Sequence, residues 1–199
     1  MTTISQRARH SGLYAAVALL AASLLASPRA RAQGGPPLLT NDPGTPGAEN
    51  WEINVAAMPV LTRDAHNYQL PQFDINYGIG SRIQLTLEIP YVVATFPGQP
   101  HATGWSNAFP GVKWRFIDAK HGWNVSIFPQ LETGGASGDV RKGIADSGTR
   151  FLLPLELQKN IGPVELNAEA GYYFPFHETN QGHEERILGF AAGHQFTKK

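Results

Sequence analysis

Hydrophobic and polar residues alternate along eight segments of this chain. In residues 82–95, for example, Ile83, Leu85 and Leu87 share one face, and Gln84 and Thr86 share the other. A period of two is the pattern of a β-strand whose two faces meet different surroundings. No helical period of comparable length competes with it. The predicted strands are residues 51–61, 68–77, 82–95, 107–116, 123–133, 149–159, 164–174 and 186–196.

The connections between these segments alternate in length. The short ones are residues 78–81, 118–122 and 160–163, and the long ones are residues 96–106, 134–148 and 175–185. Several strands approach the ~9 to 11 residues that a tilted strand needs to cross a bilayer. Short turns on one side and long loops on the other are typical of outer-membrane barrels. The pattern therefore predicts an all-β fold, an antiparallel transmembrane β-barrel with eight strands present.

Alternation alone does not say which face lies inside. A soluble sandwich or a lipocalin-like barrel also alternates, with its apolar face inward. The aromatic residues favour the membrane fold, because they fall at strand ends as interfacial girdles do. The predicted girdle residues are Trp51, Tyr77, Trp114 and Trp123 beside the short turns, and Tyr91, Phe151, Tyr172 and Phe174 beside the long loops. The short turns are then periplasmic, and residues 134–148 form a mobile, solvated extracellular loop.

Residues 1–32 have the pattern of a secretory signal peptide. Arg7 and Arg9 precede an apolar run at 13–26, and an Ala-Arg-Ala sequence offers a cleavage site before Gln33. An uncleaved anchor is the alternative, but the run is shorter than the ~20 residues of a spanning helix. We expect export to the outer membrane of a Gram-negative bacterium. Residues 33–50 are rich in proline and glycine and are predicted to be an irregular periplasmic lead-in.

Composition excludes several classes of function. Four of the 16 basic residues lie in the leader and none of the 16 acids does, so the mature chain is mildly acidic and has no basic patch for nucleic acid. The chain has no cysteine, which excludes disulfides and thiolate metal sites. Its serines lack the context of a nucleophile elbow, so no enzyme is predicted. The histidines and glutamates of residues 175–185 lack the spacing of a known metal site, so no metal or cofactor is predicted.

Charged residues on the polar face of the strands are predicted to line the barrel interior. These lumen candidates are Glu52, Asp74, Arg82, Glu88, Lys113, Arg115, Glu132, Glu156, Glu165 and Glu169. In a narrow barrel, opposite charges would pair and fill the interior. In a wider barrel the same groups would line a wet, polar path. The sequence leaves both arrangements open.

Several stretches resemble the outer-membrane transporters named for the meta-pathway of phenol degradation. They are residues 35–47 (GPPLLTNDPGTPG), 50–54 (NWEIN), 74–78 (DINYG) with 83–85 (IQL), 111–116 (GVKWRF) and 154–159 (PLELQK). None is a catalytic signature, and their order and spacing carry the resemblance. The resemblance implies a porin-like β-barrel and a role in the uptake of small aromatic or otherwise apolar compounds.

Two hypotheses follow for the function. The first is a passive outer-membrane channel or transporter for small apolar or aromatic compounds. The second is a structural or adhesion barrel with a closed interior, which transports nothing. Either would have outer-membrane lipid and the barrel assembly machinery as partners. Because members of the resembled family continue with further strands beyond the point matching Lys199, we expect an incomplete barrel, with closure of the eighth strand on the first as the alternative.

Overall fold

The computed structural model describes residues 40–62, 66–119, 122–176 and 185–194. These residues form one large antiparallel β-sheet and one short helix, α2 (Ser137–Arg141). The leader, its cleavage site, His177 and His183 lie outside the described residues. Within the described part of the chain, no helix is long and apolar enough to cross a membrane. The all-β, antiparallel part of the fold prediction is therefore confirmed.

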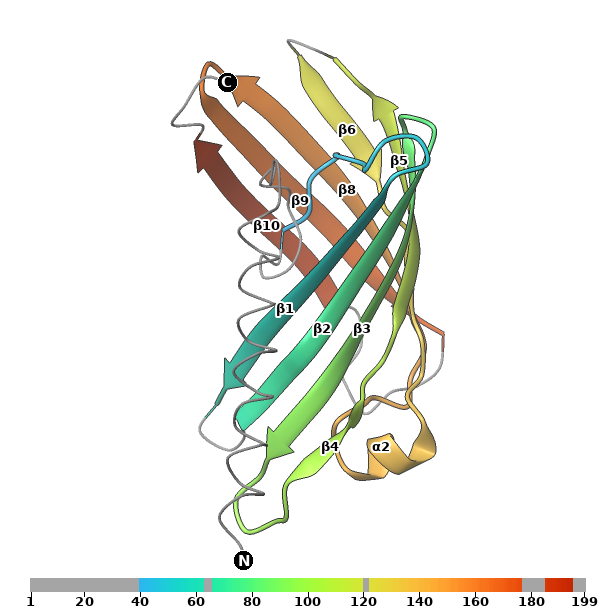
Figure 1. The fold of residues 1–199 in the computed structure, drawn as a ribbon, viewed down its shortest axis with the longest axis vertical. Helices are drawn as coiled ribbons and strands as arrows, with labels where there is room; N and C mark the ends of the chain where they lie inside the picture. The colour runs from blue at the N-terminus through green and yellow to red at the C-terminus, as the bar shows by residue number, and fades with distance from the viewer. Residues whose placement is uncertain (1–39, 63–65, 120–121, 177–184, 195–199) are drawn as a thin grey trace, which may run out of the picture. The chain divides into compact units, whose positions relative to one another are not determined.

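Ten strands make up the sheet (Figure 1). They are β1 (Trp51–Leu61), β2 (His66–Ile79), β3 (Ile83–Thr95), β4 (Ala102–Trp105), β5 (Phe109–Ile117), β6 (Trp123–Ile127), β7 (Gln130–Glu132), β8 (Arg150–Ile161), β9 (Val164–Pro175) and β10 (Glu185–His194). The order across the sheet follows the chain. Both β4 and β5 pair with β3, and both β6 and β7 pair with β8, so the ten strands occupy eight positions.

Most predicted strand ends are within two residues of the structure, and two larger differences remain. Residues 123–133 form two strands, β6 and β7, rather than one. The strand β4 lies within residues 96–106, which were predicted to be a loop. Its four residues include Gly104, and they pair with Tyr91 to Ala94 of β3. Four residues around a glycine are too few to produce a recognisable alternation, so the pairing with β3 defines this strand.

The short turns form where the sequence predicted them. Gly162 and Pro163 alone join β8 to β9, and Gly162 has a φ of 60°. Gly80 begins the turn between β2 and β3 with a φ of 61°. Glycine adopts a positive φ without the steric cost that a Cβ atom imposes. A glycine at the first position of a two-residue turn also matches the right-handed twist of the flanking strands.

The strands β1 and β10 are the edges of the sheet as described. β1 pairs with β2 in register from Trp51 opposite Tyr77, and β10 pairs with β9 from Glu185 opposite Tyr173. Among the described residues no pairing joins β1 to β10. Because the sheet is antiparallel and has eight positions, these two edge strands run in opposite directions.

The long connection between β7 and β8 is largely accessible to solvent, as expected for residues 134–148, but it is also folded and anchored to the sheet. Ile144 is 4% exposed and packs in a small apolar cluster with Val92 and Ala94 of β3. The side chain of Asn107 anchors the connection through three hydrogen bonds to its backbone. Its Nδ2 donates to the carbonyl oxygens of Thr133 and Asp146, and its Oδ1 accepts from the backbone N–H of Asp146. The sequence did not predict this anchoring, because the apolar cluster combines residues more than 40 positions apart in the chain.

Candidate functional site

The two faces of the sheet differ in polarity, and the polar face is the buried one. Asp74 and Lys113 are 7% and 4% exposed, whereas Ile53 and Phe190 on the opposite face are 60% and 74% exposed. We call the buried polar face the inner face and the other the outer face. A soluble protein buries its large apolar side chains and exposes its charged ones. The structure thus answers the question that alternation left open, because it places the polar face inside.

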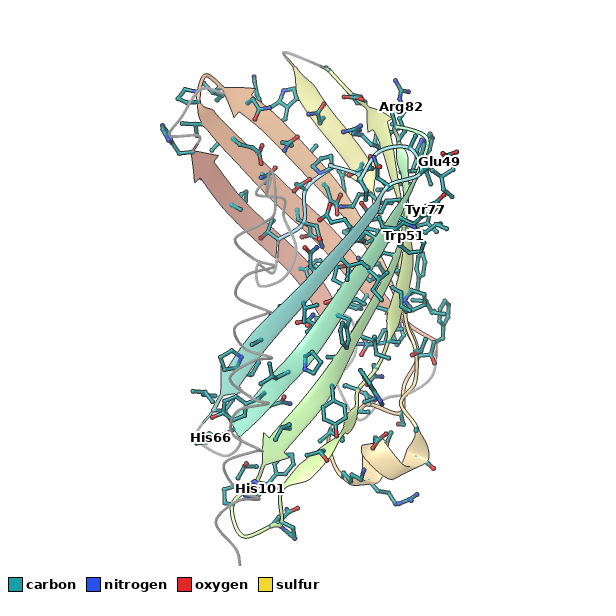
Figure 2. The ribbon with its side chains drawn as sticks, viewed as in Figure 1. Glu49, Trp51, His66, Tyr77, Arg82 and His101 are labelled. Atoms are coloured by element: carbon teal, nitrogen blue, oxygen red, sulfur yellow. The ribbon has the colours of Figure 1, made fainter. Side chains whose placement is uncertain are left out.

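Nine of the ten lumen candidates lie on the inner face or at its rim. Asp74, Lys113, Glu132, Glu156 and Glu169 are buried, and Glu52, Glu88, Arg115 and Glu165 are partly buried. Arg82 differs from the prediction. It lies in the turn between β2 and β3 and is exposed, so it belongs to the short-turn end of the molecule (Figure 2). The strand begins at Ile83, one residue later than the alternation predicted.

The predicted girdle residues lie on the outer face, at both ends of the strands. At the short-turn end, the rings of Trp51 and Tyr77 have centroids 4.8 Å apart (Figure 2). Trp114 and Trp123 lie at the same end and are about half exposed. At the long-loop end, the rings pair in the same way: Tyr91 with Trp105 at 5.2 Å, Phe151 with Phe174 at 6.2 Å, and Tyr172 with Phe174 at 4.6 Å.

The distance between the two aromatic belts can be worked out from the strand register. Trp114 is opposite Ile83, and Tyr91 lies eight residues further along β3. Trp123 is opposite Lys159, eight residues from Phe151 on β8. Eight residues at ~3.4 Å each span about 27 Å along a strand. At a tilt of ~40° this is roughly 21 Å across, near the ~25 Å apolar band of outer-membrane barrels.

A buried ion pair crosses the inner face. The Nζ atom of Lys113 on β5 lies 3.4 Å from a carboxylate oxygen of Glu156 on β8, and the two side chains are 5% and 0% exposed. The hydroxyl of Ser126 donates to the same carboxylate at 2.5 Å. The ammonium group also lies 4.7 Å from the centre of the Phe128 ring. Each of these buried charges depends on the other for its stabilisation, because no water could solvate one of them if its partner were removed.

A second cluster surrounds Arg150 at the long-loop end of β8. Its guanidinium group donates to Glu132 from Nε at 2.7 Å and pairs with the same carboxylate through Nη2 at 2.5 Å. Nη1 reaches Glu185 of β10 at 2.8 Å. The guanidinium also lies 4.4 Å from the centre of the Tyr173 ring. One arginine therefore ties together β7, β8, β9 and β10.

The inner face of β1, β2 and β3 is held by uncharged amide groups instead. Asn54 donates to Asp74 at 3.0 Å, and Asn76 donates to the other oxygen of the same carboxylate at 2.9 Å. Gln84 donates to Asn76 at 2.7 Å. Gln72 donates to Glu88. Cross-strand hydrogen bonds of this kind stabilise a face that holds few apolar contacts.

The lead-in crosses the inner face. Among residues 40–46, Asn41 donates its backbone N–H to Glu169 of β9 at 2.8 Å, and the carbonyl oxygen of Asp42 accepts from Lys113 of β5 at 2.6 Å. Thr40 lies against Gly189 of β10, where a Cβ atom would be 2.5 Å from its hydroxyl. The sequence correctly predicted an irregular segment, but it gave no sign that this segment would be buried.

The space that remains beside the lead-in is small. A cavity of about 30 Å³ is lined by eleven residues: Asn41, Asp42, Gly44, Glu52, Asp74, Asn76, Gln84, Thr86, Glu88, Lys113 and Phe128. This volume has room for about two water molecules. Sites for drug-sized ligands have ~300 to 1,000 Å³. This cavity, which the described side chains and the lead-in enclose, is therefore too small for such a ligand.

Comparison with known proteins adds no assignment. The sequence matches no protein-family model, and no curated protein or solved structure is significantly similar to the chain. Among the described residues no group of His, Asp and Glu side chains has the geometry to hold a metal ion. What the chain does must therefore be argued from the two faces, the aromatic belts and the polar interior.

Sequence reasoning missed several residues of this face. Ser126, Gln72 and Asn107 carry buried hydrogen bonds but were not among the candidates, because the search considered charged groups only. Their positions on the polar side of the alternation could have identified them. Trp105 joins the belt at the long-loop end but fell in a segment predicted to be a loop. The signal available in the sequence was the residue type, because tryptophan is enriched in interfacial belts.

Proposed function

We propose that this chain forms a transmembrane β-barrel of the bacterial outer membrane and provides a passive route for small solutes. One observation carries the membrane assignment: charged side chains are buried on one face, while Trp, Leu, Ile and Phe side chains are exposed on the other. In water, both the buried charges and the exposed apolar side chains would be unfavourable. In a bilayer, the exposed apolar face contacts lipid hydrocarbon instead of water. The two aromatic belts, separated by about the thickness of an apolar band, support the same assignment.

Closure of the barrel is part of this proposal. An unpaired strand edge in hydrocarbon leaves N–H and C=O groups without partners, at a cost of several kcal/mol each. The edge strands β1 and β10 run in opposite directions, so they can pair with one another or with additional antiparallel strands. The number of strands sets the width of the interior, since eight strands enclose little beyond side chains.

The polar inner face supports transport of small solutes that keep contact with water. The resemblance to phenol-pathway transporters adds small aromatic compounds as the first solutes to test. A second function, a closed structural or adhesion barrel, is favoured by one specific observation, the cavity of only about 30 Å³. Transport then requires the lead-in to leave the inner face, or further strands to widen it.

Two measurements test the proposal. The first is location: the mature protein begins at Gln33, fractionates with the outer membrane and changes gel mobility on heating. Recovery as a soluble periplasmic protein contradicts the membrane assignment. The second is swelling of liposomes that contain the purified protein, with phenolic compounds and sugars of matched size as solutes. Swelling with any of them supports a route, and a correctly inserted barrel that admits none of them favours the closed structural barrel.

A further inference from the structure

The described strands place eight carboxylates but only three basic side chains on the inner face or at its rim. The carboxylates are Glu52, Asp74, Glu88, Glu132, Glu156, Glu165, Glu169 and Glu185, and the basic residues are Lys113, Arg115 and Arg150. Each basic residue is already paired: Lys113 with Glu156, Arg150 with Glu132, and Arg115 with Asp118 at the rim. The remaining inner-face carboxylates outnumber the basic groups that could neutralise them.

Asp74 and Glu88 are two of these remaining carboxylates. Both line the 30 Å³ cavity, and among the described residues neither takes part in an ion pair. Their hydrogen bonds come from the amides of Asn54, Asn76 and Gln72, which carry no charge. Amide donors orient a carboxylate but leave its negative charge in place.

A second, independent observation concerns hydrogen-bond acceptors. Four oxygen atoms of inner-face side chains are buried and have no hydrogen-bond donor within the described structure: Oδ1 of Asn67, Oε1 of Gln72, Oε1 of Glu156 and Oδ1 of Asn167. Gln72, Glu156 and Asn167 are 5%, 0% and 9% exposed, and Gln72 is bound to Glu88 at the edge of the cavity. On the same face one buried donor, Nε of Arg115, has no acceptor. A buried acceptor without a donor is costly, and such acceptors outnumber the unpartnered donor on this face four to one.

We propose that the inner face selects small cations over anions. This inference rests on the proposed function, because selection requires a route, and it specifies the class of solute that the route favours. A cation would supply positive charge close to Asp74 and Glu88. A cation that carries N–H groups would also supply hydrogen-bond donors for the unpartnered oxygen atoms. An interior lined by many carboxylates raises the local concentration of cations and excludes anions.

The test uses single channels of the full chain in planar bilayers under a KCl gradient, at mildly alkaline pH so that the carboxyl groups ionise. The reversal potential gives the ratio of K⁺ to Cl⁻ permeability, and we expect K⁺ to be favoured by about tenfold. Glu88→Gln brings the ratio closer to one, and the double variant Asp74→Asn with Glu88→Gln brings it closer still. Glu49→Gln is the matched control, because Glu49 is exposed in the turn before β1 (Figure 2).

The possible outcomes separate this inference from the proposed function. Channels that favour Cl⁻, or that favour neither ion, overturn the inference and leave the route intact. A ratio that stays unchanged in the double variant also overturns it, provided that heat-modifiable mobility shows the variant to be folded. If the double variant fails to fold, the single Glu88→Gln substitution decides the question in the same way. Absence of any conductance in an inserted barrel overturns the proposed route and the inference together.

Discussion

Replacing Lys113 by methionine tests whether the ion pair between β5 and β8 stabilises the inner face. Methionine keeps most of the length of the side chain and removes its charge. Among the described residues, Glu156, whose side chain is fully buried, then has no ion-pair partner and retains only the hydroxyl of Ser126. Removing one partner of a buried pair costs about 3 to 5 kcal/mol, because the other charge stays desolvated without compensation.

The lead-in adds to this cost through a second contact of the same ammonium group. Lys113 donates to the carbonyl oxygen of Asp42 at 2.6 Å, and a hydrogen bond from a charged donor contributes about 1.5 to 3 kcal/mol. These contributions overlap, because the lead-in can rearrange once its anchor is lost. We therefore expect Lys113→Met to lower the free energy of unfolding by about 3 to 5 kcal/mol in total.

The assay is reversible urea unfolding in lipid vesicles, followed by tryptophan fluorescence. Arg115→Met is the matched control on the same strand. Arg115 pairs with Asp118 and donates to the carbonyl oxygen of Ser81, and both contacts lie at the more exposed rim, so this substitution should cost less than Lys113→Met. Glu156→Gln removes the charge left behind, so the double variant with Lys113→Met should cost less than the sum of the two single variants, by about 1 to 3 kcal/mol. Strict additivity, or equal costs for Lys113→Met and Arg115→Met, would refute the reasoning.

Three further predictions concern the outer face, the lead-in and the long connection. Leu87→Arg places a charge mid-strand on the exposed apolar face and should cost about 2 to 4 kcal/mol in a bilayer, whereas Thr86→Arg on the inner face should cost less; equal costs from urea unfolding would contradict this assignment of the two faces. Gly189→Val pushes against the lead-in and should raise the conductance in planar bilayers, whereas Gly193→Val, whose Cβ atom would find only ordinary contacts, should leave it unchanged; equal conductances would refute the role of the lead-in as an obstruction. Asn107→Ala removes three hydrogen bonds to the backbone of the connection and should speed hydrogen exchange in residues 133–148, and exchange as slow as in the wild type would contradict the anchoring.

The strand positions were predictable because they depend on local patterns. Alternation is repeated every second residue, and the β-strand has the same period, so the predicted segments agree with the observed strands within a few residues. Glycines such as Gly80 and Gly162 marked the short turns, because few other residues adopt a positive φ. The aromatic belts were predictable for the same reason, because the position of a residue in the sequence of a strand gives its distance from the two ends of that strand.

The sequence alone determined the all-β fold, the two faces of each strand and the ends at which the aromatic rings gather. Only the tertiary structure decided which face is inside, because inversion of the sheet leaves the alternation unchanged. It also decided that Lys113 pairs with Glu156 and that the lead-in crosses the inner face. These contacts join residues far apart in the chain, 128 positions in the case of Asn41 and Glu169. No local pattern specifies such contacts, since they depend on the register and curvature of the whole sheet.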